Sequence, residues 1–247
     1  FIAVSRVLDL GIKRIIEDSS GNAGISISAY GRLVGLDVEV HGPIDMPRGK
    51  VDILKKLGAL VFLSGSRMDA HKRAIMRKNG VYIGHLYNPF FLEGMKTVSY
   101  ELFMQAGDKA FRNIVVPIGS GTLLLGLWRG VKDLMDSGLI DKFRVVGVEA
   151  AGYEEVYKAI YGSSSGLEKT DLADGLRVTN KPRINEIVNV ISKYGDVVVV
   201  DRDEIHIAYD YLWDKGLIVE YSSAATVAGA IKAHKNSLIE EPITVIL

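Results

Sequence analysis

The feature that most restricts the fold is the regular alternation of short apolar runs with amphipathic helical stretches along the chain. Residues 113–117 and 197–201 are rich in valine and isoleucine and lack polar alternation, which is typical of strands covered by helices on both faces. Each run and its following helical stretch have the length of a right-handed crossover between parallel strands. The pattern therefore predicts an α/β fold of doubly wound parallel sheets.

The predicted elements divide the chain into two domains, residues 1–106 and 107–247, because one series of alternating elements ends near Gly107 and another begins. Residues 152–185 interrupt the alternation and are expected to form a long loop or lid. Strands are expected at residues 14–18, 37–41, 59–63, 81–86, 113–117, 144–149, 197–201 and 244–247. Helices are expected at residues 23–33, 49–57, 68–78, 92–105, 122–136, 203–215 and 223–234.

The charge balance and the missing residue types exclude several classes of function. The sequence has 30 lysines and arginines against 30 aspartates and glutamates, so there is no electrostatic reason to expect nucleic acid or an anionic membrane as partner. No apolar run reaches the about 18 residues that a membrane span needs. The absence of cysteine removes disulfides and thiolate chemistry, and a cytoplasmic location is the default expectation. The five histidines are scattered without ligand-like spacing, so no metal site is predicted.

Two glycine-rich turns follow predicted strands and open predicted helices. The first consists of Ser19, Ser20, Gly21, Asn22, Ala23 and Gly24. Its small residues let backbone N–H groups converge on a carboxylate at a helix N-terminus, and Asn22 adds a side chain that both donates and accepts hydrogen bonds. Ordinary helix capping is the alternative interpretation, because serine and asparagine are favoured caps in all proteins.

The second turn joins a buried strand to a helix and consists of Gly119, Ser120, Gly121 and Thr122. The glycines allow close approach of the backbone to a phosphate, the hydroxyls add hydrogen bonds, and the helix dipole favours a dianion there. A dinucleotide fingerprint is the alternative, supported by the acidic strand end at Glu149 but weakened by Leu124 in place of the third glycine. That alternative would make the protein a nicotinamide-dependent oxidoreductase.

Five segments in a fixed order are more specific than either turn alone. They are Ser-Ser-Gly-Asn-Ala-Gly at 19–24, Asn-Pro-Phe with Glu-Gly-Met-Lys-Thr within 88–97, Val-Pro-Ile-Gly-Ser-Gly-Thr at 116–122, Ala-Asp-Gly-Leu at 173–176 and Glu-Tyr-Ser-Ser-Ala-Ala at 220–225. In this order they resemble the threonine synthase family. That family belongs to the fold-type II pyridoxal 5′-phosphate enzymes, related to tryptophan synthase β. The resemblance extends from about Gly11 to Leu247.

The resemblance implies pyridoxal 5′-phosphate as cofactor and an amino acid as small-molecule substrate. The residues that it places on the substrate carboxylate are Ser19, Ser20, Gly21, Ala23 and Gly24. The residues that it places on the cofactor are Asn22 (at the ring 3′-oxygen), Gly119, Ser120, Gly121 and Thr122 (at the phosphate), and Ser222 and Ser223 (near the ring). Residues 1–106 are then the substrate-side domain and residues 107–247 the phosphate-binding domain, in a family whose members are commonly homodimers.

Such enzymes attach the cofactor to a lysine some tens of residues before the asparagine turn. Lys13 is too close to that turn and Lys96 matches a helix position of the family, so no catalytic residue is assigned in this sequence. The sequence opens within a helical pattern at residues 1–10 and closes within an apolar run at 243–247, so a longer chain that includes the lysine is expected. The alternative is a truncated paralogue that no longer catalyses.

The preferred hypothesis for function is a lyase that converts O-phosphohomoserine to threonine. A β-elimination or β-replacement enzyme, similar to threonine dehydratase or cysteine synthase, is the first alternative. The second is a non-catalytic binding module of the same fold, because without the lysine turnover is expected to collapse.

Overall fold

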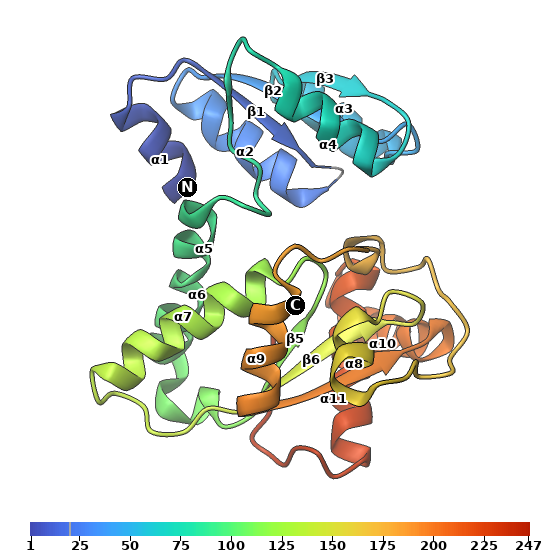
Figure 1. Cartoon of the computed structure of the whole chain (residues 1–247). Coiled ribbons are helices and arrows are strands. Elements are labelled where there is room, and N and C mark those ends of the chain that lie inside the picture. The colour runs from blue at the N-terminus through green and yellow to red at the C-terminus, as the bar shows by residue number, and fades with distance from the viewer. Residues whose placement is uncertain (20) are drawn as a thin grey trace. The chain divides into compact units, whose positions relative to one another are not determined.

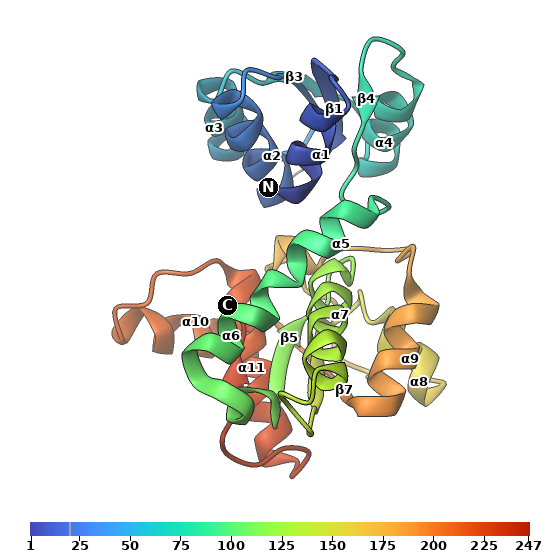
Figure 2. The same ribbon diagram turned by 90° about the vertical axis from the view of Figure 1, so that its left-hand side faces the viewer.

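The computed structural model describes residues 1–19 and 21–247 (Figures 1 and 2). The chain forms two compact units, Phe1–Gly94 and Met95–Leu247. Each unit contains a four-stranded sheet whose strand pairs are parallel. The predicted α/β class, with parallel sheets in two domains, is confirmed. Within the described residues, the helices lack the combination of length and apolar composition that a membrane span needs.

The sheet of the first unit has the strand order β3-β2-β1-β4. Its core is formed by branched side chains of the strands, such as Ile15 and Val40, together with Ile27 and Leu54 from the helices. The strands are β1 (Arg14–Asp18), β2 (Asp37–Gly42), β3 (Leu60–Leu63) and β4 (Val81–Tyr82). The helices are α1 (Ile2–Asp9), α2 (Asn22–Leu33), α3 (Arg48–Lys56) and α4 (Arg67–Met76), and α5 (Pro89–Met95) spans the division between the units.

The sheet of the second unit has the strand order β7-β6-β5-β8. Its strands are β5 (Ile114–Pro117), β6 (Val145–Ala150), β7 (Gly195–Val200) and β8 (Thr244–Val245). The helices are α6 (Thr97–Ala106), α7 (Thr122–Asp136), α8 (Glu155–Tyr161), α9 (Ile184–Tyr194), α10 (Arg202–Asp214) and α11 (Tyr221–Lys235). Two short 3-10 helices, η1 (Gly107–Phe111) and η2 (Asp174–Leu176), complete the unit.

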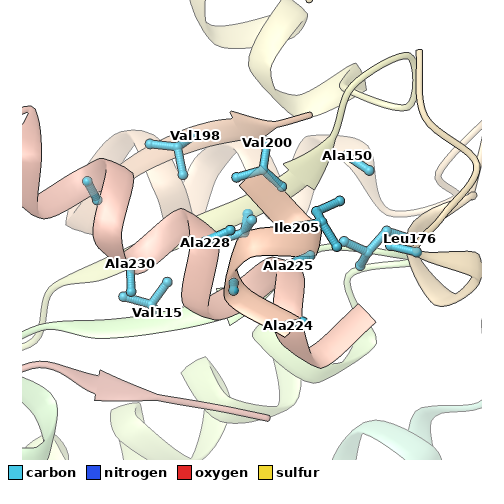
Figure 3. Packing of buried hydrophobic residues seen from close by; sticks show 14 of the residues in the cluster. Val115, Ala150, Leu176, Val198, Val200, Ile205, Ala224, Ala225, Ala228 and Ala230 are labelled. Atoms are coloured by element: carbon cyan, nitrogen blue, oxygen red, sulfur yellow. The ribbon is translucent and has the colours of Figure 1, made fainter. Parts of the chain in front are cut away.

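Helices cover both faces of this second sheet. A Cβ added to Gly229 of α11 would lie 2.3 Å from Val148 Cγ2, whereas one added to Gly147 would approach Ile191 of α9 at 3.2 Å. Because successive strand residues point to opposite faces, α11 and α9 cover opposite sides of β6. The face beneath α11 is packed by small and branched side chains, among them Val115, Val198, Val200, Ile205, Ala224, Ala225 and Ala228 (Figure 3).

The strand order reverses beside the first strand of each sheet. β1 lies between β2 and β4, and β5 lies between β6 and β8. The turn after β1 leads into α2, and the turn after β5 leads into α7. In open parallel sheets, ligands bind at the carboxyl ends of the strands where the order reverses. Both predicted glycine-rich turns therefore occupy the switch point of their own sheet.

The largest departures from the predicted elements lie around the division between the units. The strand predicted at residues 81–86 is the short β4, and the helix predicted at 92–105 is divided into α5 and α6. α6 packs on α7 within the second unit, where Ser99 Oγ donates to Leu127 O at 2.8 Å. The contacts therefore divide the chain after Gly94, whereas the sequence pattern places the boundary near Gly107.

Two helices of the second unit, α8 and α9, are absent from the sequence prediction. α8 lies within the expected loop, and its first-turn amides at Val156 and Tyr157 donate to Glu149 at 3.2 and 2.9 Å. This contact between a strand end and a helix is tertiary, so local periodicity does not reveal it. α9 buries Ile187 and Ile191, whose helical spacing is visible in the sequence and could have identified the helix.

Replacing Gly31 of α2 by alanine is expected to destabilise the protein by about 1–3 kcal/mol. An added Cβ would lie 2.4 Å from Val38 Cγ2 in the core, and this overpacking outweighs the better helix propensity of alanine. Urea unfolding measures the change. Gly49→Ala in α3 is the matched control, because no atom lies within 4 Å of its added Cβ, and it should leave stability equal or raised. Equal unfolding midpoints for the two variants would contradict the packing.

Candidate active site

The turn between β5 and α7 is built to receive an anion. The strand ends at Pro117, Gly121 occupies the N-cap position with φ of 84°, and α7 continues for 15 residues. Its N-terminus carries no acidic side chain in the first turn. The hydroxyls of Ser120 and Thr122 lie 3.0 Å apart on the same turn. Unpaired N–H groups and the positive end of the helix dipole meet there, which favours a phosphate or carboxylate.

Two glycines of this turn have no room for a side chain. A Cβ on Gly119 would lie 2.4 Å from the carbonyl oxygen of Gly175, and a Cβ on Gly121 would lie 2.2 Å from Ile187 Cδ1. The first contact is with backbone, which cannot rotate away, and the positive φ of Gly121 adds a second reason for glycine. The bare backbone of the turn is therefore a requirement of the surrounding structure.

A further segment, the 3-10 helix η2, lies against this turn through Gly175. Gly175 N donates to Ser222 Oγ at 3.0 Å, which joins η2 to the first turn of α11. Ser223 follows in the same helix turn, and its amide donates to Glu220 O at 3.0 Å. The expected cofactor residues of the second unit lie on two elements, which both contact Gly175 of η2. They are Gly119, Ser120, Gly121 and Thr122 on the turn before α7, and Ser222 and Ser223 on α11.

The other predicted turn belongs to the first unit. Ser19 is buried, its hydroxyl accepts a hydrogen bond from Gly21 N at 3.2 Å, and Gly21 occupies the N-cap position of α2. Asn22 is the first residue of α2 and is exposed, Ala23 is half-buried, and Gly24 packs closely against Ser19. Ser20, which the sequence analysis also places on the substrate carboxylate, lies outside the described residues.

A network of ionisable side chains at the carboxyl end of β1 was not predicted. Asp18 accepts from Tyr82 OH at 2.5 Å and pairs with His71 Nδ1 at 2.7 Å. Glu17 is fully buried and pairs with His85 Nδ1 at 2.5 Å. The sequence analysis treats these histidines as scattered, but the adjacent acids Glu17 and Asp18 at a strand end were a usable signal. Within the described part of the chain, no group of three such side chains is arranged to hold a metal ion.

The carboxylates of this network raise the pKa of two neighbours. Burial, together with the charge of Asp18 and its hydrogen bond, raises the pKa of the Tyr82 phenol, so this group stays protonated and donates. Burial acts to lower the pKa of His85, but the hydrogen bond and charge of Glu17 and the charge of Asp18 outweigh it, and the pKa is raised overall. The two carboxylates therefore stabilise the charged form of His85 relative to a free imidazole.

Glu149 has a different role from the one that a dinucleotide site would require. Its carboxylate is fully buried, lies 3.2 Å from Lys181 Nζ and accepts both amides at the start of α8. A carboxylate enclosed in this way is not presented to a ribose hydroxyl, which removes the main support for the nicotinamide alternative.

The pairing of His85 with Glu17 predicts a pH-dependent contribution to stability. A raised folded-state pKa means that the contribution is fully present below the unfolded pKa of about 6.5 and is lost as pH rises through the folded value. The stability difference between the protein and His85→Gln should therefore shrink as the pH rises above about 6.5. Thermal unfolding from mildly acid to alkaline pH tests this, and a difference that grows with pH would refute it. His206→Gln is the control. The His206 ring packs edge-on against Tyr221, and this aromatic contact does not require a charged imidazole.

Comparison with known protein sequences identifies the family. The profile of the family described as "Pyridoxal-phosphate dependent enzyme" matches residues 2–247. A threonine synthase of Methanosarcina acetivorans is 26% identical, over 99% of this chain and 63% of its own length. An L-threonine dehydratase of Pasteurella multocida is 30% identical, over 92% of this chain and 44% of its own length. The chain thus spans less than two thirds of the length of both relatives.

Solved structures share the fold. A pyridoxal 5′-phosphate-dependent aspartate racemase has a TM-score of 0.82 at 22% identity, covering all of this chain and 77% of its own. The serine racemase of Dictyostelium discoideum has a TM-score of 0.76 at 25% identity, covering 99% of this chain and 79% of its own. The predicted cofactor, pyridoxal phosphate, is confirmed at the level of the family. Because the family profile matches residues 2–247 of its sequence, this chain belongs to the pyridoxal-phosphate dependent enzymes.

Proposed function

We propose that this protein holds pyridoxal phosphate on the turn after β5 and acts as a lyase on an amino acid, converting O-phosphohomoserine to threonine. The observation that carries the proposal is the glycine cradle at the switch point of the second sheet, where Gly119 and Gly121 exclude side chains in front of α7. The similarity to threonine synthases of Methanosarcina acetivorans and Methanocaldococcus jannaschii, each 26% identical, supports this choice of substrate.

The residues of the turn fit a phosphate group. The backbone at Gly119 and Gly121 is bare, so its amides would donate to phosphate oxygens at close range. The hydroxyls of Ser120 and Thr122 lie beside each other and would donate to the same group. The dianion would sit at the positive end of a 15-residue helix, which favours its charge.

Ser222 is proposed to lie beside the cofactor ring. Its oxygen already accepts from Gly175 N, so its own proton remains available to donate to a ring nitrogen. Ser223 is proposed to lie close to the same ring. When bound, the cofactor supplies an electron sink for negative charge that develops at the α-carbon of the amino acid.

In the first unit, the turn from Ser19 to Gly24 is proposed to bind the carboxylate of the substrate. Ser19 fixes the turn through its bond to Gly21 N, and α2 has no acidic residue in its first turn that would repel an anion. Asn22 is proposed to hydrogen-bond the ring 3′-oxygen of the cofactor. We extend the proposal to the units as a whole, with a substrate-side first domain and a phosphate-binding second domain in a homodimer.

A threonine dehydratase is the second candidate. The relative from Pasteurella multocida and an L-threonine ammonia-lyase of Geobacter sulfurreducens are 30% and 27% identical, against 26% for each of the two threonine synthases. Both reactions start from a carboxylate and an amino group on the same carbon, so the turn at Ser19 and Gly21 would serve either substrate.

Assays with pyridoxal phosphate and single substrates separate these candidates. Release of phosphate and formation of threonine from O-phosphohomoserine are the expected results. Formation of 2-oxobutyrate from threonine, with no reaction of O-phosphohomoserine, would replace the proposal with the dehydratase. Intact mass after borohydride reduction is the accompanying measurement, and one added pyridoxyl group is expected in protein that includes the Schiff-base lysine, which has no assigned residue in this sequence. Amino-acid binding with neither turnover nor adduct would instead indicate a non-catalytic binding module.

Gly119→Ala is expected to weaken the binding of pyridoxal phosphate at least tenfold. The added methyl group would lie 2.4 Å from Gly175 O, so the turn and η2 must separate and the amides lose their convergence. Titration followed by cofactor absorbance measures the dissociation constant. Gly49→Ala, with open space around its added Cβ, should bind the cofactor as the unsubstituted protein does. Unchanged affinity of Gly119→Ala would reject this turn as the phosphate site.

A further inference from the structure

A buried ion pair in the second unit has no part in the site described so far. Lys181 is 3% exposed and Glu149 is fully buried. Lysine is almost never buried to this degree unless it is paired, because removing an ammonium group from water is costly. The pair lies where the long segment between β6 and α9 returns towards the sheet. The pair therefore connects this segment to the end of β6.

The ammonium group of Lys181 is enclosed by three oxygen atoms. Nζ donates to Tyr153 O at 2.9 Å and to Val178 O at 3.0 Å, and it lies 3.2 Å from Glu149 Oε1. These three acceptors match the three protons of an ammonium group. They come from the end of β6, from the residues before α8, and from the return of the long segment. One cation thus joins three separate stretches of chain.

The backbone of Lys181 is held at the same place. The carboxylate of Glu155, in the first turn of α8, accepts from Asn180 N at 2.6 Å and from Lys181 N at 3.0 Å. Glu149 in turn accepts the α8 amides at Val156 and Tyr157. The start of α8 and residues 178–181 therefore form one rigid anchor with the end of β6.

From this anchor the chain leads directly to the phosphate turn. Residues 173–178 form a compact turn, with Leu176 N donating to Ala173 O at 3.0 Å and Val178 N donating to Leu176 O at 2.8 Å. Its other side faces Gly119, whose added Cβ would lie 2.4 Å from Gly175 O and 3.7 Å from Val178 Cγ2. The same turn donates from Gly175 N to Ser222 Oγ.

We infer that Lys181 is a positioning residue for the cofactor phosphate, acting as an internal cation that sets residues 173–178 against Gly119 and Ser222. It acts through the carbonyl of Val178, not by touching the phosphate. The inference rests on the proposed cofactor site. This role of Lys181 and Glu149 is separate from the roles that the glycine motif and the family resemblance imply.

The test measures cofactor binding without the Schiff base. Pyridoxamine 5′-phosphate has the phosphate but no aldehyde, so its affinity reports the non-covalent site, and isothermal titration calorimetry gives the dissociation constant. Lys181→Met keeps the stem but leaves the buried charge of Glu149 without its cation, so the melting temperature of this variant should fall strongly. In Lys181→Met/Glu149→Gln both charges are absent and the glutamine oxygen can still accept one of the two α8 amides, so part of the melting temperature should return. The double variant therefore separates stability from positioning.

The expected result is that the folded double variant binds pyridoxamine 5′-phosphate at least tenfold more weakly than the unsubstituted protein. Affinity within twofold of the unsubstituted value would overturn the inference, because Lys181 would then be a structural residue only. Lys232→Met is the matched control, since Lys232 Nζ donates to Val199 O at 2.8 Å and lies 2.9 Å from Glu204 Oε1 in the same unit. This control should bind normally, and an equal loss there would also count against the inference. Failure of the unsubstituted protein to bind would overturn the cofactor site itself.

Discussion

Parallel pairing places the carboxyl ends of all strands of a sheet at one edge, and the rest of this structure depends on that constraint. In the second unit, β5 pairs with β6 on one side and β8 on the other, so the turn after β5 lies where the strand order reverses. The same edge receives the end of β6, where Glu149 captures the start of α8. Residues that are far apart in sequence, such as Gly119 and Gly175, meet there for this reason.

At both switch points a glycine occupies the N-cap position of the following helix, Gly21 before α2 and Gly121 before α7, but the surroundings differ. In the second unit the turn before α7 is enclosed by backbone and apolar atoms, namely Gly175 O and Ile187. In the first unit the strand before the turn ends in Glu17 and Asp18, which bind His85, His71 and Tyr82. A bare turn at a helix N-terminus suits a phosphate, whereas a polar strand end with hydrogen-bond donors suits a smaller polar ligand. This difference agrees with the proposed division between cofactor phosphate and amino-acid substrate.

In the second unit a buried ion pair lies where a long connection returns to the sheet. Lys181 and Glu149 join the end of β6 to the return of a segment that carries one short helix and one 3-10 turn. The segment contributes Tyr153, Ala173 and Leu176 to the core of the unit, and these directed polar contacts add to that packing. The charge is retained although a buried pair is costly, because its oxygen acceptors fix specific backbone positions.

The sequence alone determined the fold class, most strands and the positions of the two glycine-rich turns, because hydrophobic period and glycine placement are local properties. It also contained the spacing of α9, at Ile187 and Ile191, although the prediction did not use it. Only the tertiary structure decided that α6 belongs to the second unit, that Glu149 pairs with Lys181, and that Gly175 closes against Gly119. Each of these depends on contacts between residues distant in the chain, whose strength comes from burial and geometry that no local pattern encodes.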